Sequence, residues 1–504
     1  MPGPNFLYYG DNLDVLRRHV KDESVDLVYL DPPFKSNQDY NVLFAEQDGS
    51  RAAAQIKAFE DTWSWDEAAA RAFQDTIEVG GDTAKAMLAF MTFLGPSDMI
   101  AYLSMMAPRL SELRRVLKPT GSIYLHCDPT ASHYLKMLMD AIFEPLNFCN
   151  EIIWHYRKWP SGRYTFQRNH DVILFYSKSR DRDRVFNSNL DPMERTASTL
   201  KRFGKATIIS GHDESGARVP SKTSDEESAG VRRDDVWDIG RVPPIKQLYP
   251  TEKPLPLLER IIGFSSNRGD LVLDPFCGCG TAVLAAQKLN RNWIGIDITH
   301  LAVNLIKHRL FNSYGSSVPY TVVGEPTAVE DAAELAKQDP FQFQAWALGL
   351  VGARVAGSSK KGADKGIDGR LYFHDEPTGG KTKQIILSVK AGNLTASQVR
   401  DLRGVVEREN AEIGVLISFE EPTRPMRKEA AEAGFYKSPW GNHPRMQIFT
   451  VQELLAGKKI DYPPARQTNV TYKKAERKGA YEDHEQLQMV AEPTPPEFDS
   501  KDDS

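Results

Sequence analysis

The sequence contains little of what marks disulfide-rich, zinc-binding or membrane proteins. It has 4 cysteines among 504 residues, and no two of them form a Cys-x-x-Cys pair. We therefore expect neither a disulfide framework nor a zinc site of that type. No apolar run approaches the roughly 20 residues that a membrane span requires. Residues 1–10 lack the basic-then-apolar pattern of a secretory signal, so we expect a cytoplasmic protein with no membrane partner.

An excess of positive charge is also absent. The formal net charge is −5, so any contact with nucleic acid must come from a local basic face. The chain has 41% hydrophobic and 26% charged residues, which are the proportions of ordinary globular domains. With 504 residues it is long enough for two or three such domains.

Apolar strand-like runs alternate with helical periodicity in two distant parts of the chain, which predicts two βαβ units and a parallel sheet. The segments of these units are Asn5–Tyr9, Leu13–Val20, Val25–Leu30, Leu271–Asp274, Thr281–Leu289 and Trp293–Ile298. Further expected elements are the helices Pro108–Leu117 and Leu255–Phe264 and the strands Gly121–His126, Ile152–Tyr156 and Asp171–Tyr176.

Composition divides the chain into a large α/β domain and a smaller one. We predict the first domain over residues 1–323, a linker merging into a helix over 324–338 and a second domain over 339–462. Residues 463–504 are polar and end in a Pro-rich acidic stretch, so we expect a disordered tail. Ser210–Asp235 is rich in Ser, Asp and Glu and is expected to be a mobile loop.

The run Leu271–Leu273 leads into the motif Asp-Pro-Phe-Cys-Gly-Cys-Gly-Thr at residues 274–281. Open α/β sheets bind ligands beyond the carboxyl ends of their strands, where glycines let the backbone come close. Gly278 and Gly280 supply that approach, and Thr281 opens the next helix. A dinucleotide fingerprint would need a third glycine where Val283 stands, so a nucleotide loop of another kind is expected. The two cysteines of the motif are interpreted as loop filler rather than as metal ligands.

The run Val25–Leu30 leads into Asp31-Pro32-Pro33-Phe34. The exocyclic amine of a nucleobase is a weak nucleophile because its lone pair is delocalised into the ring. An Asp31 carboxylate and a Pro32 carbonyl that accept both N–H bonds would direct that lone pair at an electrophile. The prolines stiffen the turn, and Phe34 offers a face on which a flipped base can stack. On its own the tetrapeptide is a weak signal, because a turn after a strand explains it in most proteins.

Together the two motifs resemble the β-class DNA amino-methyltransferases, in which the catalytic motif precedes the cofactor motif. The resemblance covers roughly Asn5 to Leu310. It implies a Rossmann-like α/β fold with an inserted target-recognition segment at about 159–241, S-adenosylmethionine as cofactor and double-stranded DNA as partner. The oligomeric state is left open, with a homodimer as one alternative.

The same resemblance assigns residues to the cofactor. Those expected to bind it are Asp11, Asn12, Lys253, Asp274, Phe276, Gly278, Gly280, Thr281 and Asp297. Lys253 belongs to the segment Tyr249–Pro254, which resembles the part of the family that completes the methionine side of the site. Asp297 ends a strand where an acidic residue reaches ribose hydroxyls. Asp11 and Asn12 match the position near the adenine, and a turn-forming Asx pair is the alternative.

The first residue of the catalytic tetrapeptide suggests the target base. In the resembled family, Asp at this position usually accompanies N6-adenine methylation, whereas Ser usually accompanies N4-cytosine methylation. Asp31 therefore favours adenine, and N4 of cytosine is the alternative. The association is one of the family and does not follow from the chemistry, since both amines need the same acceptors.

The segment Glu151–Arg184 is locally basic, with eight Lys or Arg residues against four Asp or Glu residues. Five aromatic residues are interleaved with this charge. They are Trp154, Tyr156, Trp159, Tyr164 and Phe166. Basic residues grip phosphates and aromatic rings stack on bases, so DNA contact is expected here. The alternative is a solvated edge around two core strands. His126–Asp128 ends a strand nearby, and either lines the site or simply closes the strand.

The second domain resembles the Mrr-like restriction-endonuclease fold. Asp368 precedes the expected strand Arg370–Phe373, and Lys390 ends the strand that begins at Gln384. In the resembled family such a pair holds a divalent ion and activates water, so Asp368 is the candidate ligand and Mg²⁺ the candidate ion. Ser388 departs from the family, which usually has Glu, Asp or Gln there. A nuclease and a non-cleaving DNA-binding module therefore stay open as alternatives.

Overall fold

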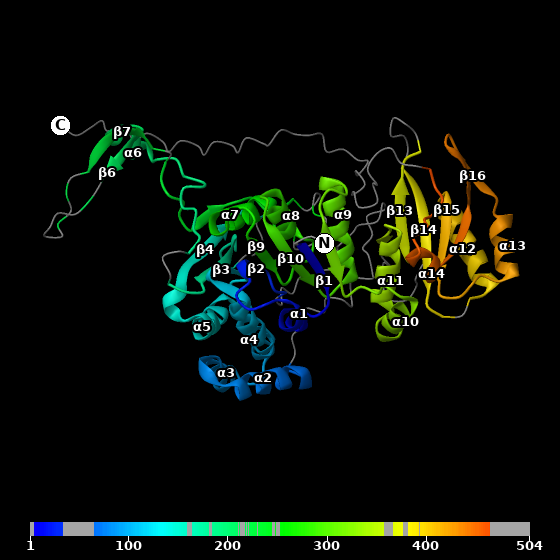
Figure 1. Cartoon of the computed structure of the whole chain (residues 1–504), viewed down its shortest axis with the longest axis horizontal. Coiled ribbons are helices and arrows are strands. Elements are labelled where there is room, and N and C mark those ends of the chain that lie inside the picture. The colour runs from blue at the N-terminus through cyan, green and yellow to red at the C-terminus, as the bar shows by residue number, and fades with distance from the viewer. Residues whose placement is uncertain are drawn as a thin grey trace, which may run out of the picture.

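The computed structural model describes residues 5–33, 65–158, 164–180, 184–209, 211, 217, 219, 221–228, 230–243, 247, 252–356, 366–375, 382–392 and 394–463. Two β-sheets, each packed against helices, lie side by side along the long axis of the molecule (Figure 1). The larger has nine strands and the smaller has five. The α/β fold class expected from the sequence is confirmed in both.

The larger sheet is parallel over most of its width. Its order is β11 (Tyr320–Val323), β1 (Asn5–Tyr9), β10 (Asn292–Asp297), β9 (Leu271–Asp274), β2 (Val25–Leu30), β3 (Leu117–Cys127), β5 (His170–Ser177), β4 (Phe148–His155) and β8 (Val236–Asp238). The strands from β11 to β3 run parallel, and β5 runs antiparallel to both β3 and β4. The bounds of β1, β2 and β9 are those predicted, because each is an apolar run bounded by polar or turn residues.

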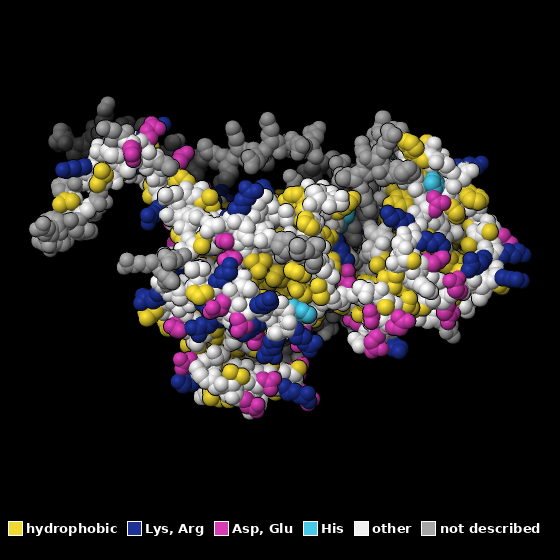
Figure 2. Space-filling model, in the orientation of Figure 1, with side chains coloured by type: hydrophobic (Ala, Val, Ile, Leu, Met, Phe, Trp, Pro, Cys, Tyr) yellow, Lys and Arg dark blue, Asp and Glu magenta, His cyan; other side chains and the backbone are white. Residues whose placement is uncertain are grey.

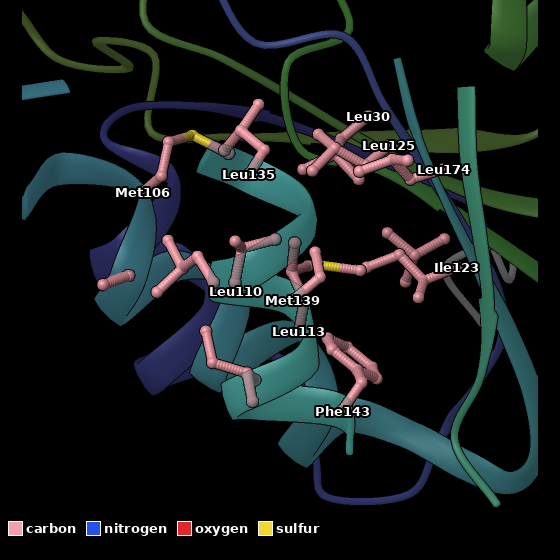
Figure 3. Packing of buried hydrophobic residues seen from close by; sticks show 14 of the residues in the cluster. Leu30, Met106, Leu110, Leu113, Ile123, Leu125, Leu135, Met139, Phe143 and Leu174 are labelled. Atoms are coloured by element: carbon pink, nitrogen blue, oxygen red, sulfur yellow. The ribbon is translucent and has the colours of Figure 1, made fainter. Parts of the chain in front are cut away.

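Helices cover both faces of this sheet. One face carries α1 (Asn12–His19), α4 (Asp98–Val116) and α5 (Ser132–Phe143), and the other carries α7 (Leu255–Ser265), α8 (Thr281–Lys288) and α9 (His300–Tyr314). Alternate residues of β2 point to the two cores, with Val28 and Leu30 on the first side and Leu27 and Tyr29 on the second. Figure 3 shows Leu110 and Leu113 of α4 and Met139 of α5 packed toward Ile123 of β3. This two-sided burial explains why the parallel strands read as continuous apolar runs.

Two additions lie outside the sheet. Helices α2 (Glu67–Val79) and α3 (Gly81–Leu94) pack beneath α4 (Figure 1). Helix α6 (Ala197–Phe203) precedes a two-stranded ribbon of β6 (Ala206–Ile209) and β7 (Lys222–Glu227). The expectation of a mobile loop over Ser210–Asp235 is therefore wrong for β7, whose polar residues form a ladder with β6. Strand β4 is preceded by a 3₁₀ turn, η2 (Pro145–Asn147).

The smaller sheet is mixed. Its order is β12 (Arg354–Val355), β13 (Gly369–Phe373), β14 (Lys383–Lys390), β15 (Ile413–Ser418) and β18 (Met446–Thr450). Helices α10 (Val329–Gln338), α11 (Pro340–Leu350) and α14 (Val451–Leu455) lie on one face, and α12 (Ala396–Arg408) and α13 (Arg424–Glu432) lie on the other. A hairpin of β16 (Phe435–Ser438) and β17 (Gly441–Pro444) flanks the sheet.

The segment expected as a linker is largely helical. Ala332 of α10 is fully buried in the core that also contains Phe343 and Trp346 of α11. Helix α9 of the larger domain contacts α11, where Asn304 Nδ2 donates to the carbonyl of Ala345 at 3.0 Å. The His300 amide also donates to Gln342 Oε1 at 3.0 Å. The two domains therefore meet through α9 and α11. Within the described ranges, no helix is both long and apolar enough to cross a membrane.

Candidate active site

The carboxyl ends of four adjacent parallel strands gather the predicted site residues at one edge of the large sheet. In the order β1, β10, β9 and β2, these strands end at Tyr9, Asp297, Asp274 and Leu30. The next residues along the chain are those singled out in the sequence, including Asp11, Asn12 and Asp31. The strand order therefore brings the glycine motif and the catalytic motif together, although nearly 250 residues separate them in the chain.

The glycine loop connects β9 with α8 and needs two residues in the left-handed region. Gly278 has φ 48° and Gly280 has φ 76°, conformations that favour glycine. A Cβ atom on Gly280 would lie 2.6 Å from Cγ1 of Ile306, so the loop also lacks room for a side chain there. Gly280 is the N-cap of α8 and Thr281 is its first residue. The backbone N–H groups at this helix end face the same edge of the sheet, which suits a polar ligand.

Asp297 supports the glycine loop from the neighbouring strand. Its Oδ2 accepts a hydrogen bond from the Gly278 amide at 2.9 Å, and its Oδ1 accepts from the amide and hydroxyl of Thr299 at 2.9 and 2.8 Å. Burial raises the pKa of Asp297 to about 6 despite these donors. Three acceptor positions of the carboxylate are thus used within the protein, whereas the sequence predicted a role directed at ribose.

Asp274 is a second buried carboxylate at this edge. Its Oδ1 accepts from the Phe276 amide at 3.1 Å. Burial raises the pKa of Asp274 well above its usual value, and the charges of Asp31 and Asp297 add to that effect. A buried carboxyl group surrounded by other acids is stabilised in its ionised form by a cation, so this position suits an ammonium group.

Asp11 and Asn12 are held by an arginine that the sequence did not indicate. Asp11 Oδ1 caps α1 by accepting from the Leu13 amide at 2.8 Å. Its Oδ2 pairs with Arg109 Nη2 at 2.6 Å, and Arg109 Nε donates to Asn12 Oδ1 at 2.6 Å. Asn12 in turn donates to the carbonyl of Pro275 at 2.8 Å. Both residues therefore join α1 to the glycine loop, and their contact with the cofactor stays a prediction.

The catalytic tetrapeptide meets Lys253 across 222 positions of sequence. Lys253 Nζ donates to Asp31 Oδ2. Pro32 is buried and Pro33 is half-buried, while Phe34 lies outside the described residues. The segment that carries Lys253 is fixed by Arg309, which pairs with Glu252 at 3.0 Å and donates to the carbonyl of Cys279 at 2.8 Å. Lys253 was expected beside the cofactor, and the structure places its ammonium against the Asp31 carboxylate.

A hydrogen-bonded network beside Asp31 was not predicted. Asp171, at the start of β5, accepts from the Tyr156 hydroxyl at 2.8 Å and contacts His126 Nε2 at 3.3 Å. His126 Nδ1 lies 3.1 Å from the hydroxyl of Tyr29 on β2. Burial acts to raise the pKa of Asp171, but hydrogen bonds from His126 and Tyr156 and the charge of Lys253 outweigh it and lower that pKa. A polar residue opening an otherwise apolar strand was the available sequence signal for Asp171.

The aromatic residues of the basic segment divide into two groups. Trp154 and Tyr156 are buried, which agrees with the interpretation as core strand residues. Tyr164 and Phe166 are 94% and 100% exposed, and Trp159 lies outside the described residues. Over the face shown in Figure 2, Lys and Arg side chains alternate with Asp and Glu side chains. The exposed rings of Tyr164 and Phe166 are therefore the aromatic side chains of this segment that are open to a partner in its described part.

In the smaller domain, Asp368, Ser388 and Lys390 meet as the sequence predicted. Asp368 is buried, and its Oδ2 accepts from the Ser388 hydroxyl at 2.9 Å and the Val389 amide at 2.6 Å. The same oxygen lies 3.5 Å from Lys390 Nζ. Among the described residues, no group of three or more His, Cys, Asp and Glu side chains is arranged to hold a metal ion. One buried carboxylate engaged by a hydroxyl, an amide and an ammonium does not fit a Mg²⁺ site.

Two family models match separate parts of the chain. The model of the family described as DNA methylase matches residues 25–308. The model of a family described as NACHT-associated inactive Restriction Endonuclease 1 matches residues 341–456.

The sequence identities to individual proteins are low. The chain is 31% identical to the type II methyltransferase M.HpaI of Haemophilus parainfluenzae over 223 residues, which cover 43% of this chain and 62% of that protein. It is 26% identical to M.EcaI of Enterobacter cloacae over 362 residues, covering 61% and 69% of the two chains. A crystal structure of the cytosine-N4-specific PvuII DNA methyltransferase has 15% identity and a TM-score of 0.35, covering 62% of this chain and 88% of that one.

Proposed function

The chain belongs to the DNA methylase family, and from that premise we propose that it methylates the N6 amine of adenine in double-stranded DNA. S-adenosylmethionine supplies the methyl group. The observation that carries the proposal is the meeting of two motifs at one edge of the sheet. The glycine loop of residues 274–281 and Asp31 lie there on adjacent strands, and the segment of Lys253 connects them.

The residues of this edge match the chemistry of amine methylation. Asp31 and the carbonyl of Pro32 are the acceptors for the two N–H bonds of the target amine, which directs its lone pair away from the ring. Asp274 suits the ammonium of the cofactor, because it is buried among acids and its charge is stabilised by a cation. The transfer is a direct displacement that depends on position and electrostatics, so it needs no metal.

We propose that the DNA reaches Asp31 from the side of β4 and β5. The network from Tyr29 through His126 and Asp171 to Tyr156 lines that side of the site. The exposed rings of Tyr164 and Phe166 belong to the segment proposed for target recognition, at about 159–241. Phe34 is proposed as the face on which the flipped base stacks.

Adenine is favoured over cytosine because Asp31 opens the tetrapeptide. M.HpaI and M.EcaI are described only as type II methyltransferases, and the PvuII enzyme is described as cytosine-N4-specific. The test is incubation of unmethylated duplex DNA with the protein and S-adenosylmethionine, followed by digestion and nucleoside mass spectrometry. N6-methyladenine is the expected product. If N4-methylcytosine is the only methylated base found, the target is cytosine rather than adenine. If no methylated base is found, the proposal is overturned.

We propose that the smaller domain, over about 339–462, is a non-cleaving module. Asp368 Oδ2 is already engaged by Ser388, Val389 and Lys390, and Ser388 is a poorer ion ligand than a carboxylate. The family whose model matches this region is described as inactive. The full chain is therefore expected to leave plasmid DNA intact in Mg²⁺ or Mn²⁺. Cleavage that disappears in an Asp368→Ala, Lys390→Ala double variant would show instead that the site is a nuclease.

A further inference from the structure

Lys253 occupies the carboxylate that must accept the target amine. Lys253 Nζ donates to Asp31 Oδ2, and the Lys253 and Asp31 side chains are 16% and 26% exposed. A carboxylate that already accepts from an ammonium has one acceptor position fewer for a nucleobase. Its negative charge is also partly neutralised, which weakens the hydrogen bond that the amine N–H can form. The pairing with Lys253 therefore weakens the hold of Asp31 on a base in this arrangement.

Lys253 is surrounded by acids from three strands. Besides Asp31 at the end of β2, its charge favours the ionised forms of Asp171 at the start of β5 and of Asp274 at the end of β9. Burial nevertheless leaves the pKa of Asp274 raised. The segment of Lys253 is fixed to the glycine loop, because Arg309 binds both Glu252 and the carbonyl of Cys279. The ammonium thus lies between the catalytic carboxylate and the loop proposed to hold the cofactor.

The cofactor carries a group that competes for Lys253. Its methionine part ends in an α-carboxylate, which needs a cationic or N–H donor when it leaves water. Two arginines that contact this region are already engaged, Arg309 with Glu252 and Cys279, and Arg109 with Asp11 and Asn12. Lys253 has three N–H donors on a flexible stem and can change partner by a rotation of its side chain.

We propose that Lys253 is a positioning residue that moves from Asp31 to the α-carboxylate of the cofactor, so that cofactor binding releases Asp31 for the target amine. The proposal rests on the function proposed above and adds an order to it, with cofactor first and base second. Binding linkage is reciprocal, so a ligand that takes Lys253 strengthens the grip on the base, and the base strengthens the grip on that ligand.

Two ligands separate the contribution of the amino-acid part of the cofactor from that of its adenosine part. S-adenosylhomocysteine keeps the α-carboxylate, whereas 5′-methylthioadenosine lacks the whole amino-acid part. In calorimetry, Lys253→Met is expected to weaken S-adenosylhomocysteine about tenfold or more, the size of a charged hydrogen bond. Binding of 5′-methylthioadenosine is expected to stay within about twofold. Lys253→Arg should restore most of the preference for the carboxylate ligand. It keeps the cation, so it also covers the case in which the Met variant does not fold.

Lys288→Met is the matched control, because Lys288 pairs with Glu259 and is 55% exposed. It removes one positive charge of the same domain and should change neither affinity. If Lys253→Met weakens both ligands equally, or neither, the role of Lys253 is overturned while the proposed function stands. A wild-type chain that binds neither ligand would overturn the proposed function and this proposal with it.

The release of Asp31 has its own readout. It is measured by fluorescence with a DNA duplex that carries 2-aminopurine beside the target adenine. The fluorescence of 2-aminopurine rises when the adenine leaves the stack. With the wild-type chain the signal is expected to rise with S-adenosylhomocysteine and not with 5′-methylthioadenosine. With Lys253→Met it should rise with either ligand. Equal signals from both ligands in the wild-type chain would contradict the exchange of partners.

Discussion

Asp31 combines two demands that a single carboxylate seldom meets together. In the proposed reaction it must be held in place before the base arrives, and it must then accept a hydrogen bond from a weakly basic amine. The pairing with Lys253 meets the first demand. Asp31→Ala should therefore lower the methylation rate by about 10²–10³, while calorimetry finds binding of S-adenosylhomocysteine at least as tight as in the wild-type chain. Asp82→Ala on α3 is the control, since Asp82 is 74% exposed. Near-normal turnover of Asp31→Ala would remove this residue from the proposed chemistry.

Asp297 makes stability depend on pH in a definite direction. Burial raises the folded-state pKa of this acid from 3.8 to about 6. Its contribution to the free energy of unfolding is thus fully present below about pH 4 and is lost as the pH rises through 6. The shift corresponds to about 3 kcal/mol. In Asp297→Asn, which cannot ionise, the free energy of unfolding should fall less between pH 4 and 6 than in the wild-type chain. The free energies of unfolding are measured by denaturant titration at each pH. If they change with pH equally in the two chains, Asp297 does not titrate in this window.

At the scale of elements, the glycine loop allows the cost of backbone strain to be compared with the cost of a steric clash. Gly280 and Gly315 both have positive φ, at 76° and 62°, but only a Cβ on Gly280 would meet another side chain. Gly315→Ala should cost about 1 kcal/mol, the usual strain of an L residue in that region. Gly280→Ala should cost about 1–3 kcal/mol more, because Ile306 must move, and it should also weaken cofactor binding. Thermal unfolding and calorimetry measure both effects, and equal losses of stability would contradict the close contact.

Elements formed by local patterns were predictable, and contacts between distant segments were not. The strands β1, β2 and β9 have the predicted bounds, because each is a short apolar run that must be buried on both faces. Strand β7 was missed, since its stability comes from pairing with β6 rather than from its own composition. A polar sequence alone carries no sign of such a partner.

The same limit applies to the candidate site. The sequence predicted the motifs, because strand ends and glycines leave local signals. It assigned Lys253 to the cofactor and did not predict its contact with Asp31, since that contact depends on the packing of α7 and β2 across the sheet. Asp171 and Arg109 were missed for the same reason, as each acts on residues contributed by other elements.

At the scale of the whole molecule, the two domains share a small contact close to the site. Thr299 is the N-cap of α9 and binds Asp297, and the following residue, His300, donates its amide to Gln342 of α11. The side that supports the glycine loop is therefore joined to the first helices of the smaller domain. This link places the smaller domain beside the methylase domain.

The contact can be tested with two glycines that both lie inside helices. Gly349 of α11 faces Asn304 of α9, and a Cβ there would lie 2.1 Å from the Asn304 amide nitrogen. Gly404 of α12 has nothing within 4 Å of such an atom. Gly404→Ala should stabilise the smaller domain by about 0.5–1 kcal/mol, because alanine favours a helix interior.

Gly349→Ala gains the same helix propensity but displaces Asn304 from the carbonyl of Ala345. We expect it to loosen the domains, so that calorimetric unfolding separates into two transitions and proteases cut faster between α9 and α11. The sheet edge that carries Asp31 does not contain this contact, so affinity for S-adenosylhomocysteine should fall less than in Gly280→Ala. If Gly349→Ala stabilises the chain as Gly404→Ala does, with unchanged proteolysis, the α9–α11 contact does not hold the domains together.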